Sequence, residues 1–305
     1  MELLANILIG VIVAATPLLF AAIGELVVEK SGVLNLGVEG MMIVGAIAAF
    51  AVTVTTNSYL LGLLAAAIAG ALMAGIFGVL TQVLLSNQVA TGLALSMFGL
   101  GLSALLGQGF AGRSAGAFPH LYLPVLSDLP GIGKLVFSLD PLVYLSLALV
   151  AGVAWFLKTR SGLIMRAVGE NHDAAHAIGY SVVMIRVLAL LFGGVCSGLG
   201  GAYLSIVQTP LWVEKMTAGR GWIALALVVF AAWRPWRILL GAYLFGGITI
   251  LQLHGQGFGI KINAQVLSML PYIATIVVLV LISRDVTKVR LNAPACLGKA
   301  FYATA

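Results

Sequence analysis

The sequence predicts an all-α membrane protein, a polytopic bundle of transmembrane helices that forms a single domain over residues 1–305. Hydrophobic residues make up 61% of the chain and charged residues 9%, whereas a soluble domain carries about 45–50% apolar and about 25% charged residues. Glycine is also frequent, at 37 residues, and small residues let helices approach closely in lipid. The formal charge of +6 does not indicate nucleic acid, because the basic residues lie mostly at the ends of apolar segments.

The apolar segments are long enough for about nine spans, because the core of a bilayer takes roughly 20 helical residues. We predict spans at 3–28, 33–56, 59–85, 89–108, 139–157, 182–207, 219–233, 237–254 and 266–283. The seventh is short, which indicates a half-helix or a helix tilted against a neighbour. The first lacks preceding basic residues, so we interpret it as a transmembrane helix and not a cleaved signal peptide.

The basic residues predict the orientation, because cytoplasmic loops are enriched in Lys and Arg. With the N-terminus outside, eleven of the sixteen basic residues lie inside: Lys30, Lys158, Arg160, Arg166, Arg186, Arg234, Arg237, Arg284, Lys288, Arg290 and Lys299. This orientation predicts an outer loop at 109–138, a cytoplasmic loop at 158–181 and a cytoplasmic tail at 284–305. The end of that tail carries no motif to which a role can be assigned.

A carboxylate inside the second predicted span is the first candidate for function. Asn35 lies one helical turn before Glu39, at a spacing of four residues, so we predict that the two side chains share one face. A charge at bilayer depth costs a few kcal/mol and usually faces a cavity or a partner. We predict a helix that lines a translocation path through Asn35, Gly37, Glu39 and Gly40. A buried structural hydrogen-bond network is an equally weighted alternative.

Other charged residues lie near the ends of predicted spans. Glu25 and Glu29 precede Lys30 at the cytoplasmic end of the first span, where we expect them on a solvated surface. Arg220 and Trp222 open the seventh span near the outer surface, which makes them weak candidates for an outer gate. The alternative for the arginine is a side chain that reaches to the membrane interface.

The cytoplasmic loop at 158–181 contains the second candidate, with the spacing G-x-N-x-x-A-A-x-x-x-G. Its residues are Gly169, Glu170, Asn171, Ala174, Ala175 and Gly179. Asparagine is a favoured helix N-cap and glycine a favoured helix end, so the motif predicts a short helix with a smooth, alanine-rich surface. Such a helix suits a docking element, and an ordinary loop helix is the alternative.

Two further patterns concern packing. The stretches 36–50 and 217–233 each carry a glycine, a charge and a second glycine before an apolar run, and transporters are often built from paired halves. Chance similarity between Gly-rich helices is an equal alternative. The segment GVCSG at 194–198 has the G-x-x-x-G spacing of close helix crossings, and we expect it to pack within the chain and not to drive dimerisation.

The loop motif resembles the cytoplasmic coupling loop of ABC importer permeases of the branched-chain amino acid, simple-sugar and nucleoside group. The stretch VEKSGVLNLGVEGMMIVGA at 28–46 resembles the corresponding segment of nucleoside-type members, and the resemblance covers roughly residues 15–285. The loop departs from the family pattern at His172, where proline is common, and at Tyr180, where a branched aliphatic residue is common. These departures concern the register of the docking helix.

The resemblance implies a type II-like ABC importer permease in the cytoplasmic membrane of a prokaryote. It implies two permease subunits, identical or paralogous, around a central path, with separate ABC ATPase subunits and an extracytoplasmic solute-binding protein. The loop motif would dock in the ATPase, and the helix with Glu39 would flank the path. A nucleoside is the expected solute, and a simple sugar is the alternative.

No catalytic or cofactor chemistry is expected. The chain lacks a G-x-x-x-x-G-K-[ST] phosphate loop, a G-x-S-x-G nucleophile elbow and an H-E-x-x-H zinc motif. His172 and His176 have metal-ligand spacing but no evident third ligand, so no metal site is predicted. The remaining alternative is a secondary transporter driven by an ion gradient. Such proteins usually carry several intramembrane ionisable residues, whereas only Glu39 is deeply placed here.

Overall fold

The computed structural model describes residues 2–119, 137–254 and 292–302, together with isolated positions between 266 and 280. Within these residues the regular elements are helices, and strand-like pairing is limited to one bridge between Ser114 and Leu211. The predicted all-α class is therefore confirmed. Most of the predicted span at 266–283 and much of the outer loop at 109–138 lie outside the described residues.

Each predicted span that falls on described residues is a helix. The α-helices are α1 (Glu2–Lys30), α2 (Val38–Thr56), α3 (Tyr59–Gly78), α4 (Gln88–Gly107), α6 (Pro141–Phe156), α7 (Arg160–Glu170), α8 (His172–Ala177), α9 (Val182–Ala202), α10 (Arg220–Phe230) and α11 (Pro235–His254). Short helical turns of other types continue three of them: η1 (Val79–Val83), η2 (Gln108–Phe110) and η3 (Tyr203–Gln208).

The number of membrane spans is smaller in the described residues than predicted. Five helices there are long and apolar enough to cross a membrane. A sixth span arises if α6 and α7, which meet at a bend of 76°, are counted together. The prediction of nine spans is therefore not confirmed.

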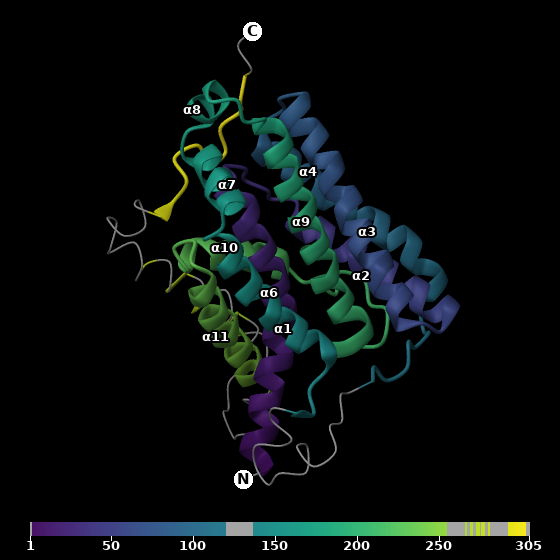
Figure 1. Ribbon diagram of the computed structural model, residues 1–305. Helices are drawn as coiled ribbons and strands as arrows, with labels where there is room; N and C mark the ends of the chain where they lie inside the picture. Colours follow the sequence, from purple (N-terminus) through teal and green to yellow (C-terminus); the bar gives the residue numbers. More distant parts are fainter. Residues whose placement is uncertain are drawn as a thin grey trace.

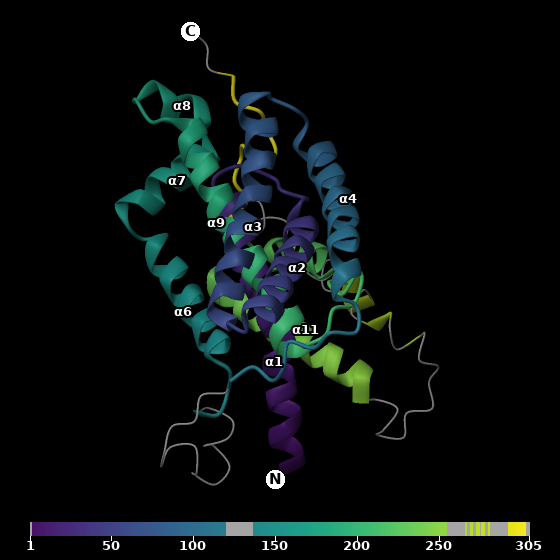
Figure 2. The same cartoon turned by 90° about the vertical axis from the view of Figure 1, so that its right-hand side faces the viewer.

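Helix α1 lies at the centre of the bundle (Figure 1). It packs against α9, α11, α10 and α6, and its residues from Ala14 to Lys30 are buried. A helix that is apolar all round is expected in such a position, because no face of it is suited to water. Figure 2 shows α4 on one flank of the bundle and α6, α7 and α8 on the other.

Glycines allow α9 to pack closely on α2 and α3. A methyl group on Gly194 would overlap the carbonyl of Gly70, and one on Gly198 would overlap that of Ala66. Gly45 of α2 meets Gly198 at the same crossing. The GVCSG motif thus packs within the chain, as the sequence predicted.

We expect Gly194→Ala to lower the melting temperature of the protein, because overpacking a close-packed site costs about 1–3 kcal/mol. The matched control is Gly101→Ala, since a methyl group there meets no atom within 4 Å. Thermal unfolding of both variants in detergent measures the effect. Equal melting temperatures for the two variants would contradict the packing of this crossing.

The two chain termini lie at opposite ends of the bundle (Figures 1 and 2). One end holds α7, α8, the last turn of α1 and the segment 292–302, and we call it the α8 end. The segment is tied to α1 there, because the Lys30 ammonium donates to the Asn292 carbonyl at 2.7 Å.

Helix α10 is a half-length helix of 11 residues, as the short seventh span predicted. After η3 the chain returns toward the α8 end, passes Gly219 in the left-handed region at φ 78°, and starts α10 beside the first turn of α2. Just beyond α10, the Trp233 indole donates to Glu29 in the last turn of α1 at 2.5 Å. Interrupted helices of this kind are common in transporters, where they bring helix ends into the membrane.

Candidate functional site

Glu39 caps the N-terminus of α10. Its Oε1 accepts hydrogen bonds from the Thr217 hydroxyl at 2.5 Å and the Gly219 amide at 2.9 Å, and its Oε2 accepts from the Gly221 amide at 2.7 Å. The side chain is 2% exposed. A carboxylate at this place pairs with helix-start amides that lack helical partners and offsets the positive end of the helix dipole. This geometry matches the hydrogen-bond network given above as the alternative for Glu39.

The two similar stretches, 36–50 and 217–233, meet at this cap. A methyl group on Gly221 would lie 2.6 Å from the Glu39 Cα, so the close approach requires glycine there. Gly40 faces the other way, where a methyl group would lie 2.7 Å from the Leu95 carbonyl oxygen of α4. Gly221, beside Arg220, therefore packs on α2, and Gly40, beside Glu39, packs on α4.

Asn35 lies in the turn before α2 and not on the helix. Its Oδ1 accepts from the Gly37 amide at 3.0 Å, an arrangement by which Asn stabilises turns. The prediction that Asn35 and Glu39 share a helical face is wrong, because α2 begins only at Val38. The side chain is fully buried, and its role in a translocation path stays a prediction, as do those of Gly37, Glu39 and Gly40.

Glu25 and Glu29 are buried, at 1% and 0% exposure, so the expectation of a solvated surface is wrong. The physical reason is the central position of α1, whose last turns are covered by neighbouring segments. The Glu25 Oε1 accepts from the Asn35 amide at 3.3 Å, and Glu29 accepts from Trp233. Near the α8 end, Glu25, Glu29 and Glu39 thus each accept hydrogen bonds from neutral donors.

The loop at 158–181 contains the predicted short helix. Asn171 caps α8, because its Oδ1 accepts from the Ala174 amide at 3.0 Å. Gly179 follows the helix with φ +94°, a conformation that favours glycine. The helix begins at His172, two residues before the predicted alanine run. Gly169 lies in the last turn of the preceding helix α7, where a methyl group would overlap the Lys30 carbonyl.

The two alanines of the loop motif point in different directions. Ala175 is 3% exposed and packs with Val168, Val182 and Phe301, whereas Ala174 is exposed. Ala177 and Ile178 are exposed as well, and the Ile178 side chain reaches 72%. We call Ala174, Ala177 and Ile178 the outer face of α8. Sequence reasoning missed Ile178, although its spacing of four from Ala174 would have placed both on one face.

Sequence reasoning also missed the C-terminal segment 292–302, which packs on the loop motif. The Cys296 amide donates to the Gly169 carbonyl at 2.9 Å. The Phe301 ring, 6% exposed, lies edge-on to His172 and His176 with centroid distances of 5.4 and 5.2 Å. The two imidazoles thus flank an aromatic ring. No sequence pattern in the segment indicated this contact.

Arg186 of α9 connects the segment to α8. The residue is fully buried, and its guanidinium contacts neutral groups: the carbonyls of Ser31 at 3.3 Å and Lys299 at 3.1 Å, the Gln82 Oε1 at 3.4 Å and the His172 Nδ1 at 3.0 Å. Because a guanidinium has no acceptor, Nδ1 of His172 accepts and the imidazole is neutral. Burial, followed by the charge of Arg186, lowers the pKa of His172 below its ordinary 6.5.

We expect docking of the segment 292–302 to weaken as the pH falls below about 6.5. The undocked state binds the His172 proton more tightly, so protonation favours it. Of the charges that shift this pKa, only that of Lys299 belongs to the segment, and it lowers the pKa when the segment is docked. The measurement is the modification rate of buried Cys296 by a thiol reagent, divided by the rate in unfolded protein at the same pH. A pH-independent ratio would contradict the prediction. His172→Asn, which retains an acceptor but does not titrate, should flatten the profile.

Arg220 and Trp222 lie in the first turn of α10, next to the Glu39 cap. The Arg220 guanidinium donates to the Met216 carbonyl at 3.1 Å, and Trp222 is 40% exposed. This position is beside the first turn of α2, because the chain runs back along the bundle after η3. Their place near the outer surface stays a prediction. A gating role stays a prediction.

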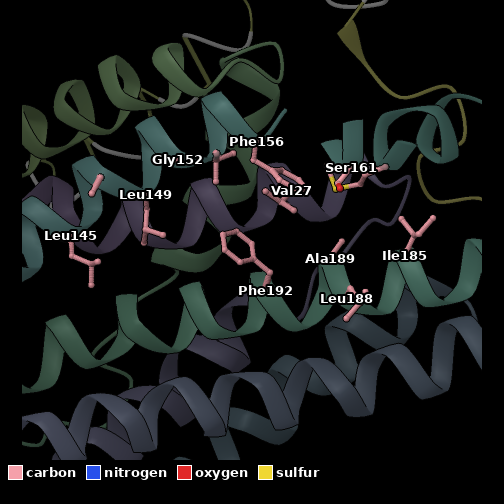
Figure 3. Close-up of a pocket in the computed structure, with 13 residues that line it drawn as sticks. Val27, Leu145, Leu149, Gly152, Phe156, Ser161, Ile185, Leu188, Ala189 and Phe192 are labelled. Carbon is pink, nitrogen blue, oxygen red and sulfur yellow. The ribbon is translucent and has the colours of Figure 1, made fainter. Parts of the chain in front are cut away.

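An apolar pocket of about 610 Å³ opens between α6 and α9, with Val27 of α1 on its wall (Figure 3). Phe156 and Phe192 contribute aromatic rings, and Ser161 supplies the one polar side chain of the lining. A solute rich in hydroxyl groups would lose its hydrogen bonds to water here without replacement. The pocket is therefore unsuited to bind a sugar or nucleoside.

Membrane-length helices, one of them half-length and preceded by an interruption, define a multi-pass membrane protein. Residues 7–282 match the family described as branched-chain amino acid transport system / permease component, and the chain belongs to this family.

Several curated relatives are similar over nearly their whole length. The chain is 41% identical over 325 residues to the putative glucose ABC transporter permease protein TsgC13 of Haloferax volcanii, covering 99% of this chain and 98% of the relative. It is 34% identical to the nucleoside ABC transporter permease protein NupC of Lactococcus lactis, covering 90% and 91%. It is 32% identical to the guanosine ABC transporter permease protein NupQ of Bacillus subtilis, covering 91% and 92%. These relatives are permeases and not enzymes. No solved structure matches the chain.

Proposed function

We propose that this permease is the membrane-spanning subunit of an ATP-driven importer that takes up nucleosides by alternating access. A simple sugar is the second candidate, because one relative is named for glucose and two are named for nucleosides or guanosine. The observation that carries the proposal is the outer face of α8, an exposed apolar surface on a helix that the rest of the chain holds in place.

The outer face of α8 is proposed to dock in a separate ATPase subunit. Ala174, Ala177 and Ile178 lie at spacings of three and four, which are neighbours on a helix surface. Single exposed apolar residues are ordinary, but here two alanines of the six-residue helix and the isoleucine that directly follows it are exposed together. Small side chains around one larger aliphatic residue suit insertion into a groove of a partner.

Movement of α8 would pass into the membrane through two neighbours. Helix α7 leads directly into α6 across the 76° bend. Helix α9 packs on α1, α2 and α3, so a shift at its start is transmitted to the centre of the bundle. Closure of an ATPase pair would thereby change the relative positions of these helices and reopen the path on the other side of the membrane.

The α8 end is proposed to be cytoplasmic, which leaves the N-terminus outside and the C-terminus inside. Lys30 lies close enough to Arg166 and Arg234 for their charges to interact, so basic residues gather at this end. Cytoplasmic ends of membrane proteins carry such an excess. The proposed partners are a pair of ABC ATPase subunits, a second permease subunit, identical or paralogous, and an extracytoplasmic solute-binding protein.

The test is uptake of radiolabelled guanosine and of glucose, compared between cells that contain the chain and cells that lack it. We expect the chain to be required for guanosine uptake, and we expect uptake to stop when ATP is depleted and to persist when a protonophore is added at maintained ATP. Loss of glucose uptake alone would assign the sugar in place of the nucleoside. Uptake that follows the ion gradient and not ATP would overturn the ATP-driven mechanism.

A further inference from the structure

We propose that the C-terminal segment 292–302 is a strut that sets the orientation of α8, so that its outer face is presented to the ATPase. The inference rests on the proposed docking role of α8 and extends it to a segment of the chain in which the sequence shows no motif. It follows from three sets of contacts, which involve the backbone, the Phe301 ring and the Arg186 guanidinium.

Backbone hydrogen bonds fix the path of the strut along the α8 end. The bonds run from the Cys296 amide to the Gly169 carbonyl at 2.9 Å and from the Gly298 amide to the Gly32 carbonyl at 3.1 Å. The first partner lies at the end of α7, directly before α8, and the second lies just after α1. The strut therefore spans from the end of the central helix α1 to the end of α7.

Phe301 determines which face of α8 points inward. Its ring contacts His172 and His176, which are four residues apart and so lie on one side of the helix. Ala175, between them, packs in the same buried cluster as the ring. His172 and Ala175 on this side are buried, whereas Ala174, Ala177 and Ile178 are exposed. Without the ring, the segment 292–302 would keep the indirect link to this six-residue helix that runs from Lys299 through Arg186 to His172.

Arg186 extends this arrangement into the bundle. The same guanidinium accepts no hydrogen bonds and donates to the strut at Lys299, and it contacts α8 at His172 and η1 at Gln82. A buried charged group is costly unless its N–H donors find hydrogen-bond acceptors. Undocking of the strut removes the Lys299 carbonyl from Arg186 and leaves a buried donor unpaired, so we expect the contacts of Arg186 to hold the strut, α8 and α9 together.

The experiment compares Phe301→Ala with Tyr302→Ala, whose side chain is 65% exposed and serves as the control. Both are made in a Cys196→Ser background, so that Cys296, 8% exposed, is the remaining thiol. In detergent we expect Phe301→Ala to raise the modification rate of Cys296 at least about tenfold and to reduce recovery of the ATPase subunits about fivefold or more. In cells we expect it to reduce ATP-driven uptake. Tyr302→Ala should match the parent, and Phe301→Tyr, which keeps the ring, should restore all three.

The possible outcomes test the strut and the docking role of α8 separately. The strut is overturned if Phe301→Ala leaves Cys296 protected. It is also overturned if Phe301→Ala exposes Cys296 while ATPase recovery and uptake stay at parent level. In both cases docking by α8 stands. If an arginine at Ile178 also leaves ATPase recovery unchanged, the docking role itself is overturned. Two results together support both the strut and the docking role. Ile178→Arg loses recovery of the ATPase subunits while Cys296 stays protected, and Phe301→Ala loses that recovery while Cys296 becomes exposed.

Discussion

Replacement of Ile178 by arginine is expected to abolish ATP-driven uptake while the helices and the strut stay folded. The Ile178 side chain is 72% exposed, so the substitution removes little packing within the chain. A hot-spot residue near the centre of an interface costs about 2 kcal/mol or more when it is changed, which corresponds to at least about a thirtyfold loss of affinity, and we expect Ile178 to be such a residue. The measurements are uptake of the labelled solute and the melting temperature of the purified protein. Parent-level uptake would contradict docking through this face.

Two further variants sharpen this prediction. Tyr302→Arg introduces the same charge at another exposed position of the α8 end and should leave uptake unchanged. Ala175→Arg should also stop uptake, but for another reason: Ala175 is 3% exposed, so the arginine displaces α8 from Phe301. The modification rate of Cys296 distinguishes the two variants. Ala175→Arg should expose this thiol to the reagent, whereas Ile178→Arg should leave it protected.

Replacement of Glu39 by alanine is expected to destabilise the protein by about 3 kcal/mol or more, because a buried donor left without a partner costs about 1–3 kcal/mol. Three donors lose their acceptor: the Thr217 hydroxyl and the amides of Gly219 and Gly221. The loss of a negative charge at the start of α10 adds to the cost. Thermal unfolding in detergent measures the effect, and a melting temperature equal to that of the parent would refute the capping role.

The conservative variant Glu39→Gln separates capping from a role in the translocation path. Glutamine keeps one acceptor oxygen but no charge, so capping predicts an intermediate loss of stability with uptake reduced in proportion to folded protein. A path role predicts parent-like stability with uptake lost. The second result would support the prediction that this residue lines the translocation path.

The features predicted correctly from the sequence are those with local causes. Apolar segments of membrane length gave the all-α class, the short segment at 219–233 gave the half-helix, and Asn171 with Gly179 gave α8 by cap chemistry. The failures depend on contacts between distant segments. The burial of Glu25 and Glu29 follows from the central position of α1, which a hydropathy pattern does not contain.

The candidate site shows the same division. That the loop motif forms a helix was predictable, but which of its alanines faces inward was not, because Phe301 lies 126 residues after Ala175 (301 minus 175). Asn35 illustrates a local error: a spacing of four was interpreted as helical, whereas the Asn35 side chain stabilises a turn that delays the helix until Val38.

The most direct measurement is photo-crosslinking from α8 in cells that take up the solute. A photoreactive amino acid is placed at Ala177 on the outer face of α8. In a separate protein it is placed at Leu211, which is 45% exposed and follows η3, at the opposite end of α9 from α8. Crosslinks to an ATPase subunit with a phosphate-loop motif from Ala177 and none from Leu211 are the predicted result. Intact uptake with no crosslink from Ala177 to an ATPase would contradict the account.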